Sequence, residues 1–441
     1  AQLTTTMMQY IDASMVGSMG AQASASIGLM ETTMWLLGSI CSAAAAGFYV
    51  QVSHQLGSND PRRARNTLRQ GIMSVLVVSA LIGLVSLAVS PFLPMWLGGG
   101  SDITPTASAY FAIVATALPI FQFSIFGAGM LRSSGNMVVP SVMSVVMMTL
   151  DVVFNFFLIF PTRPVQLFGA EVTIPGMGMG VVGAAIGTVS AELVAASITM
   201  YILCFHSKEL SLRIDTGRFL PTWGVVKRAL HISLPMGLQQ TIMCSAYVMT
   251  TIIIAPLGTF AIAANSFGVI VESLCYMPGY GIADAATTLV GQSIGAGRHE
   301  LMKRFAWLSV GLGVTVMAVM GVVMYVGAPV AMAMMTPAEE VRRLGVEVLR
   351  IEAFAEPMFA AAIVSYGVFV GAAKTLVPSI MNLVSIWGVR ISLAALLAPS
   401  MGLRGVWIAM CIELCFRGFI FLVKLKFWNI QTSCNHYGKD Q

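Results

Sequence analysis

Charged residues are scarce in this sequence. Only 10% of the 441 residues are Asp, Glu, Lys or Arg, whereas soluble domains carry roughly 25%, and 57% are hydrophobic. The mean hydropathy is +0.83. So few charges exclude a water-soluble globular protein, and we expect most of the chain to be solvated by lipid.

Several chemical signatures are also missing. The sequence has no alternating ten-residue segments, which excludes a membrane β-barrel, and no Gly-x-x-x-x-Gly-Lys-Ser/Thr motif, which excludes an ATPase of that type. Its spans show no Ser/His, His-rich or paired-Asp protease pattern, so we expect no enzyme. The seven cysteines form no CxxC motif, and we expect core thiols, no zinc or redox site and no cofactor.

Long apolar runs dominate what is present. Many reach the roughly 20 residues that a helix needs to cross a bilayer, and a helix satisfies its own backbone hydrogen bonds there. The first run starts at Ala1 without a Met and without a basic signal, so we expect that helix to be truncated. The sequence predicts an all-α membrane protein with about twelve transmembrane helices, near residues 1–19, 26–52, 71–97, 105–131, 137–160, 178–205, 229–255, 261–293, 304–335, 344–372, 376–398 and 403–427.

The basic residues gather in alternate loops. They cluster at residues 62–69, 208–228, 298–304 and 424–426, whereas the opposite loops hold few. By the positive-inside rule, this pattern predicts a multi-pass protein of the bacterial or archaeal cytoplasmic (inner) membrane with both termini cytoplasmic. The net charge of +5 is therefore interpreted as a topology signal, and no nucleic-acid partner is expected.

The sequence contains an internal repeat. A shift of 238 residues superposes three prolines and three glycines, including Pro119 on Pro357, and residues 137–143 on 375–381. Because the offset covers six helices, both copies cross the membrane in the same direction, which predicts two six-helix lobes related by a pseudo-two-fold axis along the membrane normal. A duplicated channel or scaffold remains the alternative. The predicted parts are an amino-terminal lobe (1–205), a cytoplasmic linker (206–228), a carboxy-terminal lobe (229–428) and a cytoplasmic tail (429–441).

Two motifs resemble the multidrug and toxic compound extrusion family. Residues 12–20 read Asp-Ala-Ser-Met-Val-Gly-Ser-Met-Gly, similar to the motif of its first helix, and residues 272–297 resemble the signature of its eighth helix, above all from Thr287 to Gly297. The Gly-Ala-Ala-Ile-Gly-Thr at 183–188 and the Glu356-Pro of helix ten extend the resemblance over the whole chain. The resemblance implies a two-lobed antiporter that exports organic cations against an inward flow of H⁺ or Na⁺.

The sequence departs from that family at three places. The usual Leu-Arg-Gly-x-Gly-Asp-Thr reads Phe-Val-Gly-Ala-Ala-Lys-Thr at 369–375, and Asp284 replaces a small apolar residue. Met243 and Phe359 stand where some members carry acidic Na⁺ ligands, so the resemblance does not supply that carboxy-terminal site.

Ionisable groups inside spans are functional candidates, because each costs about 2.5–3.5 kcal/mol to insert. Asp151 and Asn155 are four apart and share a helix face, while their repeat mates are Val389 and Leu393. Carboxylates in one copy only indicate a function confined to that lobe. The resemblance implies a cation-coupling site for H⁺ or Na⁺, and the matching positions are Asp12, Asp151, Asn155 and Thr188. A purely structural cluster is the alternative.

A second acidic patch is predicted in the carboxy-terminal lobe. Glu272, Glu356 and Asp284 are candidates to receive a cationic substrate or to pair with Arg390, while Glu413 and Arg417 are expected to pair with each other at a spacing of four. Candidate cavity-lining residues, chosen because Met and aromatic side chains suit promiscuous and cationic ligands, are Met34, Phe154, Tyr247 and Tyr276.

The sequence thus predicts a secondary active multidrug or organic-cation exporter, an H⁺- or Na⁺-coupled antiporter that works by alternating access of two lobes. Its expected partners are small organic, cationic substrates and the lipid bilayer, and the expected state is a monomer. The alternative is a flippase for lipid-linked oligosaccharides or lipids, which has the same fold. A flippase should present several Arg or Lys residues to a pyrophosphate, and only Arg390 and Arg417 lie deep in the predicted spans.

Overall fold

A computed structural model describes residues 11, 15, 19, 21–167 and 170–428. In this part of the chain, nine helices are long and apolar enough to cross a membrane, and two bent helix pairs add two more spans. The predicted span at 1–19 lies almost wholly outside the described residues. The expectation of an all-α membrane protein is confirmed.

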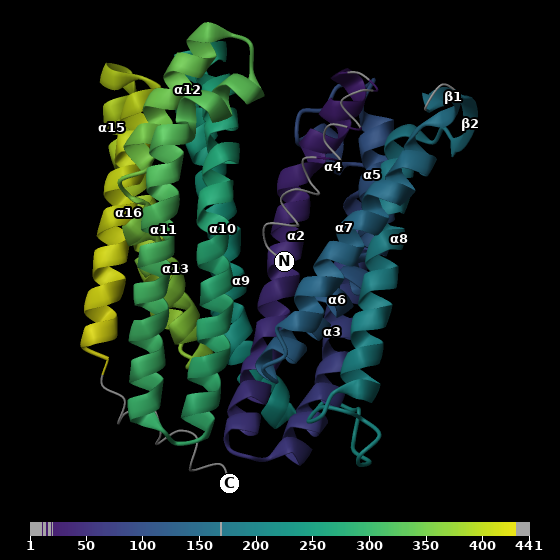
Figure 1. The fold of residues 1–441 in the computed structure, drawn as a ribbon, viewed down its shortest axis with the longest axis vertical. Coiled ribbons are helices and arrows are strands. Elements are labelled where there is room, and N and C mark those ends of the chain that lie inside the picture. The colour runs from purple at the N-terminus through teal and green to yellow at the C-terminus, as the bar shows by residue number, and fades with distance from the viewer. Residues whose placement is uncertain (1–10, 12–14, 16–18, 20, 168–169, 429–441) are drawn as a thin grey trace. The chain divides into compact units, whose positions relative to one another are not determined.

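The chain forms two compact units. Among the described residues, the first unit comprises 21–56 and 60–237, and the second comprises 57–59 and 238–428. The elements from α2 to η1 are α2 (Ala21–Gly57), α3 (Pro61–Val89), α4 (Leu93–Trp96), α5 (Thr104–Thr116), α6 (Leu118–Ser133), α7 (Val138–Ile159), β1 (Pro161–Leu167), β2 (Ala170–Met177), α8 (Gly180–Tyr201) and the π-helical turn η1 (Ile202–His206). Figure 1 shows how these helices run side by side.

The second unit follows the long helix α9 (Trp223–Ile254), whose first turns belong to the first unit. There, Ser233 Oγ donates a hydrogen bond to the carbonyl of Ala44, and Gln51 Nε2 donates one to the carbonyl of Val225. The remaining elements are η2 (Ala255–Leu257), α10 (Thr259–Gly295), α11 (His299–Met335), α12 (Glu339–Glu352), α13 (Glu356–Gly371), α14 (Leu376–Leu383), η3 (Val384–Ile391), α15 (Ser392–Met401) and α16 (Leu403–Lys426).

The sequence repeat reappears in the boundaries of the helices. The bounds of α2 and α10 coincide under the 238-residue shift, as do the bounds of α6 and α13 and the first residues of α3 and α11. Packing repeats as well. Ser133 at the end of α6 donates a hydrogen bond to the carbonyl of Tyr49, and its mate Gly371 packs closely against the carbonyl of Thr287, the mate of Tyr49.

Both units contain one bent span. The pair α5 and α6 bends by 48°, and the equivalent pair α12 and α13 bends by 58°. Pro119 and Pro357 lie in the first turn of α6 and α13, where a missing backbone N–H removes no helical hydrogen bond. They therefore lie directly after the bends, near the middle of the two bent spans.

A β-hairpin interrupts the symmetry. Strands β1 and β2 pair antiparallel between α7 and α8, with Val165 opposite Val172, where the sequence predicted only a loop. Beyond the hairpin, the first residues of α8 and α16 are fewer than 238 residues apart along the sequence, so the equivalence of the two copies is shifted there. The hairpin is therefore an insertion in the first copy.

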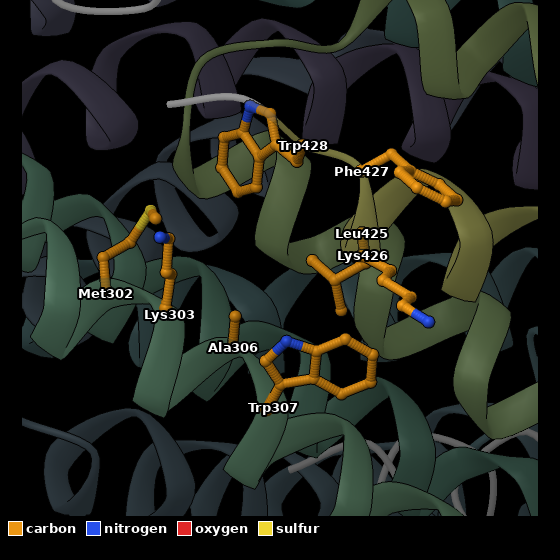
Figure 2. Close-up of a pocket in the computed structure, with 8 residues that line it drawn as sticks. All are labelled: Met302, Lys303, Ala306, Trp307, Leu425, Lys426, Phe427 and Trp428. Atoms are coloured by element: carbon orange, nitrogen blue, oxygen red, sulfur yellow. The ribbon is translucent and has the colours of Figure 1, made fainter. Parts of the chain in front are cut away.

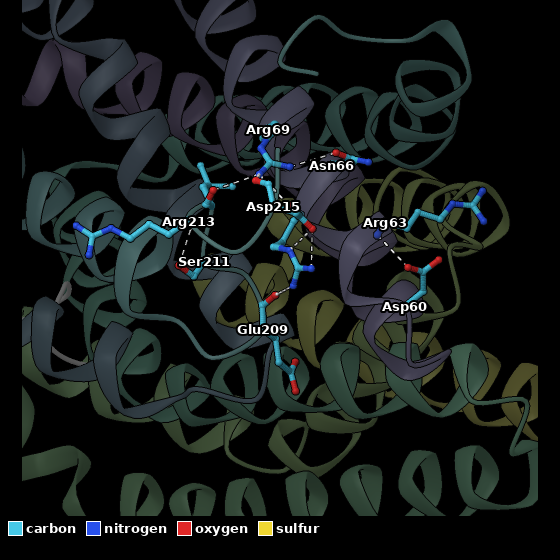
Figure 3. A network of polar contacts seen from close by, with 10 residues as sticks. Asp60, Arg63, Asn66, Arg69, Glu209, Ser211, Arg213 and Asp215 are labelled. Carbon is cyan, nitrogen blue, oxygen red and sulfur yellow. Dashed lines mark hydrogen bonds and ion pairs between the residues drawn. The ribbon is translucent and has the colours of Figure 1, made fainter. Parts of the chain in front are cut away.

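The linker after η1 is fixed to the first unit by Asp215 (Figure 3). Its carboxylate forms ion pairs with Arg65 at 2.7 Å and with Arg69 at 2.9 Å, both from the first turns of α3. The hydrogen bond from Arg65, followed by that from Arg69, holds the pKa of Asp215 below its ordinary value. The start of α3 and the linker thus lie at the same end of the unit, as the predicted topology requires.

Candidate ion and substrate sites

The amino-terminal candidate site begins with two polar side chains on α7. Asp151 and Asn155 are both 0% exposed, and Asn155 Nδ2 donates a hydrogen bond to Asp151 Oδ2 at 3.2 Å. The pairing follows from their spacing of four residues, which places both side chains on one face of the helix. The structure therefore brings together the pair that the sequence predicted.

Helix α8 packs closely over this pair. At Gly187, a Cβ atom would collide with Asn155 Oδ1, so only a glycine admits the amide at this distance between the helices. Thr188, the predicted fourth member, is the next residue of α8 and is half-buried. Asp12, the predicted first member, lies outside the described residues.

Glu192 is a further member of this site. It is buried on α8, one turn beyond Thr188, forms a side-chain hydrogen bond with Ser124 of α6 and lies within electrostatic range of Asp151. The sequence alone did not select Glu192 for this site. Its spacing of four from Thr188 was the available signal.

In the second unit, one carboxylate holds two arginines. Glu413 Oε1 lies 2.9 Å from Arg417 Nε, and Glu413 Oε2 lies 3.3 Å from Arg390 Nε. Ser385 Oγ also donates a hydrogen bond to Glu413 Oε1 at 2.6 Å. The predicted pair of Glu413 and Arg417 is confirmed, and the ion-pair partner of Arg390 is Glu413 rather than one of the acidic residues proposed for it.

Three other glutamates are buried around this ion pair. Glu272 of α10 lies within electrostatic range of Arg390 and Arg417, and Glu352 lies within range of Glu272, Glu356 and Arg390. The sequence alone did not select Glu352 for a site. Asp284 is half-buried on α10, three turns beyond Glu272.

An aromatic cluster borders these charges. The ring of Tyr276 packs edge-on against Phe359 at 5.5 Å and against Tyr280 at 5.8 Å, and the guanidinium of Arg417 lies 5.4 Å from the centre of the Phe359 ring. Of the other predicted lining residues, Met34 and Phe154 are half-buried and Tyr247 is exposed. These contacts give Tyr276 a defined position beside the acidic residues.

A separate pocket of about 420 Å³ lies between the start of α11 and the end of α16 (Figure 2). Its lining residues are Met302, Lys303, Ala306, Trp307, Leu425, Lys426, Phe427 and Trp428. None of the buried carboxyl groups contributes to it. The pocket is therefore distinct from both acidic sites.

Across the part of the chain that the structure describes, no three His, Cys, Asp or Glu side chains lie close enough to hold a metal ion together. Asn155 donates its amide hydrogen bond to Asp151 Oδ2, and the Glu192 carboxyl lies within electrostatic range of Asp151.

Comparison with known families and proteins agrees with this architecture. The family model described as MatE matches residues 1–157 and 235–396, one segment in each half of the chain. A "Probable multidrug resistance protein NorM" of Thermotoga maritima is 25% identical over 421 residues, which cover 93% of this chain and 86% of the relative. A protein of the same description from Idiomarina loihiensis is 24% identical, with 97% and 91% covered.

Solved structures share the fold. The outward-facing structure of a multidrug resistance MATE family transporter of the MOP superfamily has a TM-score of 0.87 and 19% identity, covering 98% of this chain and 93% of the other. A MOP superfamily transporter from Pyrococcus furiosus, described as having a binding pocket of reversed polarity, has a TM-score of 0.86 at 19% identity, with 96% and 91% covered.

Proposed function

The chain belongs to the MatE family, and we propose that it is a secondary active exporter of small organic, cationic molecules, driven by an inward flow of H⁺ or Na⁺. The proposed location is the bacterial or archaeal cytoplasmic membrane, with both termini cytoplasmic. The relatives named NorM are described as multidrug resistance proteins, which supports the substrate class.

The observation that carries the proposal is the buried pair of Asp151 and Asn155. Burying a carboxylate away from water is costly unless it is protonated, paired or bound to a cation, and Asn155 donates a hydrogen bond to this one. The repeat mates Val389 and Leu393 are apolar, so the helix packing of this fold does not itself require polar groups here. A cation that binds reversibly to the Asp151 carboxylate accounts both for the burial of this polar pair and for its absence from the second copy of the repeat.

Either coupling ion suits these side chains. Glu192 and Asp151 repel each other when both are ionised, so one of them should readily take up a proton. Na⁺ would find oxygen ligands in the carboxylates, the amide of Asn155 and the hydroxyl of Thr188, by analogy with other hard cations. We propose that Asp12 completes this site, and that ion binding there alternates with substrate release.

The acidic residues of the second unit support the proposal that the substrate is a cation. We propose that Glu272, Glu356 and Asp284 attract it when they are ionised and that Tyr276 contacts it, because an aromatic face attracts organic cations. The ion pairs of Arg390 and Arg417 with Glu413 weigh against the flippase alternative, since neither arginine is left to bind a pyrophosphate.

Transport in proteoliposomes tests the proposal. The wild-type protein should accumulate a fluorescent organic cation when a pH or Na⁺ gradient is imposed, and comparing the two gradients identifies the ion. Asp151→Asn and Asp12→Asn should each abolish most of the gradient-driven transport. Glu209→Gln is the control, because the Glu209 side chain is exposed in the linker. Full gradient-driven transport by both Asp variants would overturn the coupling assignment.

A further inference from the structure

The bend in the second unit has a carboxyl group on either side of it. Glu352 is the last residue of α12, Glu356 is the first residue of α13, and three residues between them form the break. The two helix axes differ in direction by 58°. Any change in charge on these two side chains therefore acts on the point where the span changes direction.

Both carboxyl groups are buried and unpartnered. Glu352 and Glu356 are each 1% exposed, and neither oxygen of either group has a hydrogen-bond partner among the described residues. Arg350, two residues before Glu352, instead directs its guanidinium to the ring of Tyr325. A carboxylate ion in this setting pays its desolvation cost without compensation, whereas a protonated carboxyl group does not.

The charged and titratable neighbours come from every helix packed against the bend. Those on α10, η3 and α16 are Glu272, Cys275, Tyr276, Arg390, Cys411, Glu413, Cys415 and Arg417. Helix α11 contributes Tyr325, whose ring packs on Phe354 within the break, Gly321, which packs on Ala353 and Glu356, and apolar residues such as Met317 and Met324. Apart from the two arginines, the groups around the bend are carboxyl, thiol and phenol groups, which are either neutral or negatively charged.

The charges of these groups do not balance when every carboxyl is ionised. Glu413 neutralises one of its two arginines, and the remaining positive charge offsets one carboxylate among Glu272, Glu352 and Glu356. The other two carboxyl groups then remain uncharged only by holding protons. Removing one of these protons creates an uncompensated negative charge beside an existing one.

The first unit provides an internal control. The repeat mates of Glu352 and Glu356 are Val114 and Leu118, both buried and apolar, and that span still bends by 48°. Equivalent glycines pack against both bends, since a Cβ on Gly83 or Gly321 would lie 2.8 Å from the carbonyl oxygen of Ala115 or Ala353. The bend thus forms without carboxyl groups, and the two glutamates are not needed to make it.

We propose that Glu352 and Glu356 form a proton-binding pair whose occupancy sets the angle between α12 and α13. A carboxylate oxygen takes the proton from water and returns it to water. When the proton leaves, repulsion between the two carboxylates acts across the three-residue break and changes the bend. This second proton site lies in the other half of the chain from the proposed coupling site and does not depend on it.

Infrared titration of the reconstituted wild-type protein is the first test. Between about pH 5 and pH 9, the range that buried carboxyl groups reach, the C=O band of protonated carboxyl groups should decrease. Part of that change should be lost in Glu352→Gln and in Glu356→Gln. The part of the change that Glu352 and Glu356 cause should persist in two controls. Glu339→Gln removes an exposed carboxyl of the same helix, and Asp151→Asn removes the proposed coupling carboxyl.

Distance measurement is the second test. Spin labels carried by genetically encoded amino acids at position 343, on α12, and at position 376, just beyond α13, both exposed, should report a shift in distance over the same pH range. Glu352→Gln combined with Glu356→Gln should remove the shift, and Glu339→Gln should retain it. An infrared band that both single variants leave unchanged, or a distance that does not depend on pH in the wild type, would overturn the proposal whatever the outcome of the transport assay.

Discussion

Gly187 is the residue that most tightly limits the amino-terminal site. A Cβ atom there would collide with Asn155 Oδ1 and push the amide away from Asp151. We therefore expect Gly187→Ala to lower the melting temperature of the detergent-solubilised protein and to reduce gradient-driven transport, with a stability loss of about 1–3 kcal/mol, as overpacking usually costs.

The matched control for Gly187 is Gly38→Ala on α2. A Cβ at Gly38 meets no atom within 4 Å. This variant should keep both the melting temperature and the transport rate of the wild type. Equal behaviour of the two alanine variants would show that the contact with Asn155 is unimportant.

Asp215 is the linker residue that forms ion pairs with α3. Removing its charge leaves Arg69, which is only 2% exposed, without its ion-pair partner. The amide of Asn keeps one acceptor oxygen but no charge, and a hydrogen bond to a charged group contributes about 1.5–3 kcal/mol against about 0.5–1.5 kcal/mol for a neutral one, so Asp215→Asn should unfold at a lower temperature. Proteolysis of the 206–222 segment should also become faster, whereas Glu209→Gln should leave both measurements unchanged.

The same ion pairs predict a dependence of stability on pH. Because the pKa of Asp215 is lower in the folded protein, its contribution is fully present above the unfolded value of about 3.9 and is lost as the pH falls through the folded value. The difference in melting temperature between wild type and Asp215→Asn should therefore shrink below about pH 4. A difference that persists in acid would contradict the ionic origin of the contact.

Residue spacing predicted contacts within a helix better than contacts between helices. The pairs Asp151–Asn155 and Glu413–Arg417 follow from a spacing of four along one helix. Glu192 and Glu352 join their clusters through neighbouring helices. A single sequence does not state which helix faces meet, so it could not rank these two carboxyl groups above others in the spans.

At the scale of elements, the two bends depend on small residues of a neighbouring helix. Gly83 and Gly321 occupy equivalent positions in the repeat, each against a carbonyl of a bend. Gly83→Ala and Gly321→Ala should each lower the melting temperature by a few degrees, because the backbone carbonyl gives way less easily than a side chain. Gly311→Ala, where a Cβ meets open space, should not, and similar losses in all three would contradict this account.

The β-hairpin is the element that the sequence did not predict. Both strands contain proline, namely Pro161 and Pro164 in β1 and Pro175 in β2. Proline removes a ladder hydrogen bond and is confined to edges and bulges, so it obscures a strand pattern. In a two-stranded sheet every strand is an edge, which is why the prolines are tolerated here.

At the scale of the whole molecule, hydropathy and the 238-residue repeat were sufficient for the fold. The equivalent ends of α2 and α10 and of α6 and α13 show that the duplication is retained in helix length. What the sequence did not indicate is that the first turns of α9 pack with the first unit, because this depends on contacts such as that of Ser233 with Ala44.

The presence of two compact units predicts that they lose structure separately. Phe126→Ala removes a fully buried ring that packs on Phe48 in the first unit and should cost about 3–5 kcal/mol there. Hydrogen exchange measured by mass spectrometry should show faster exchange in the first unit and little change in α10 to α16. Uniform acceleration along the chain would indicate a single cooperative unit.

The inserted hairpin also has a practical consequence for imaging. Particles built from two similar halves are easily averaged in the wrong orientation, because each half can be mistaken for the other. Strands β1 and β2 mark the amino-terminal half, so an antibody fragment raised against this hairpin would label one half and give each particle an unambiguous direction.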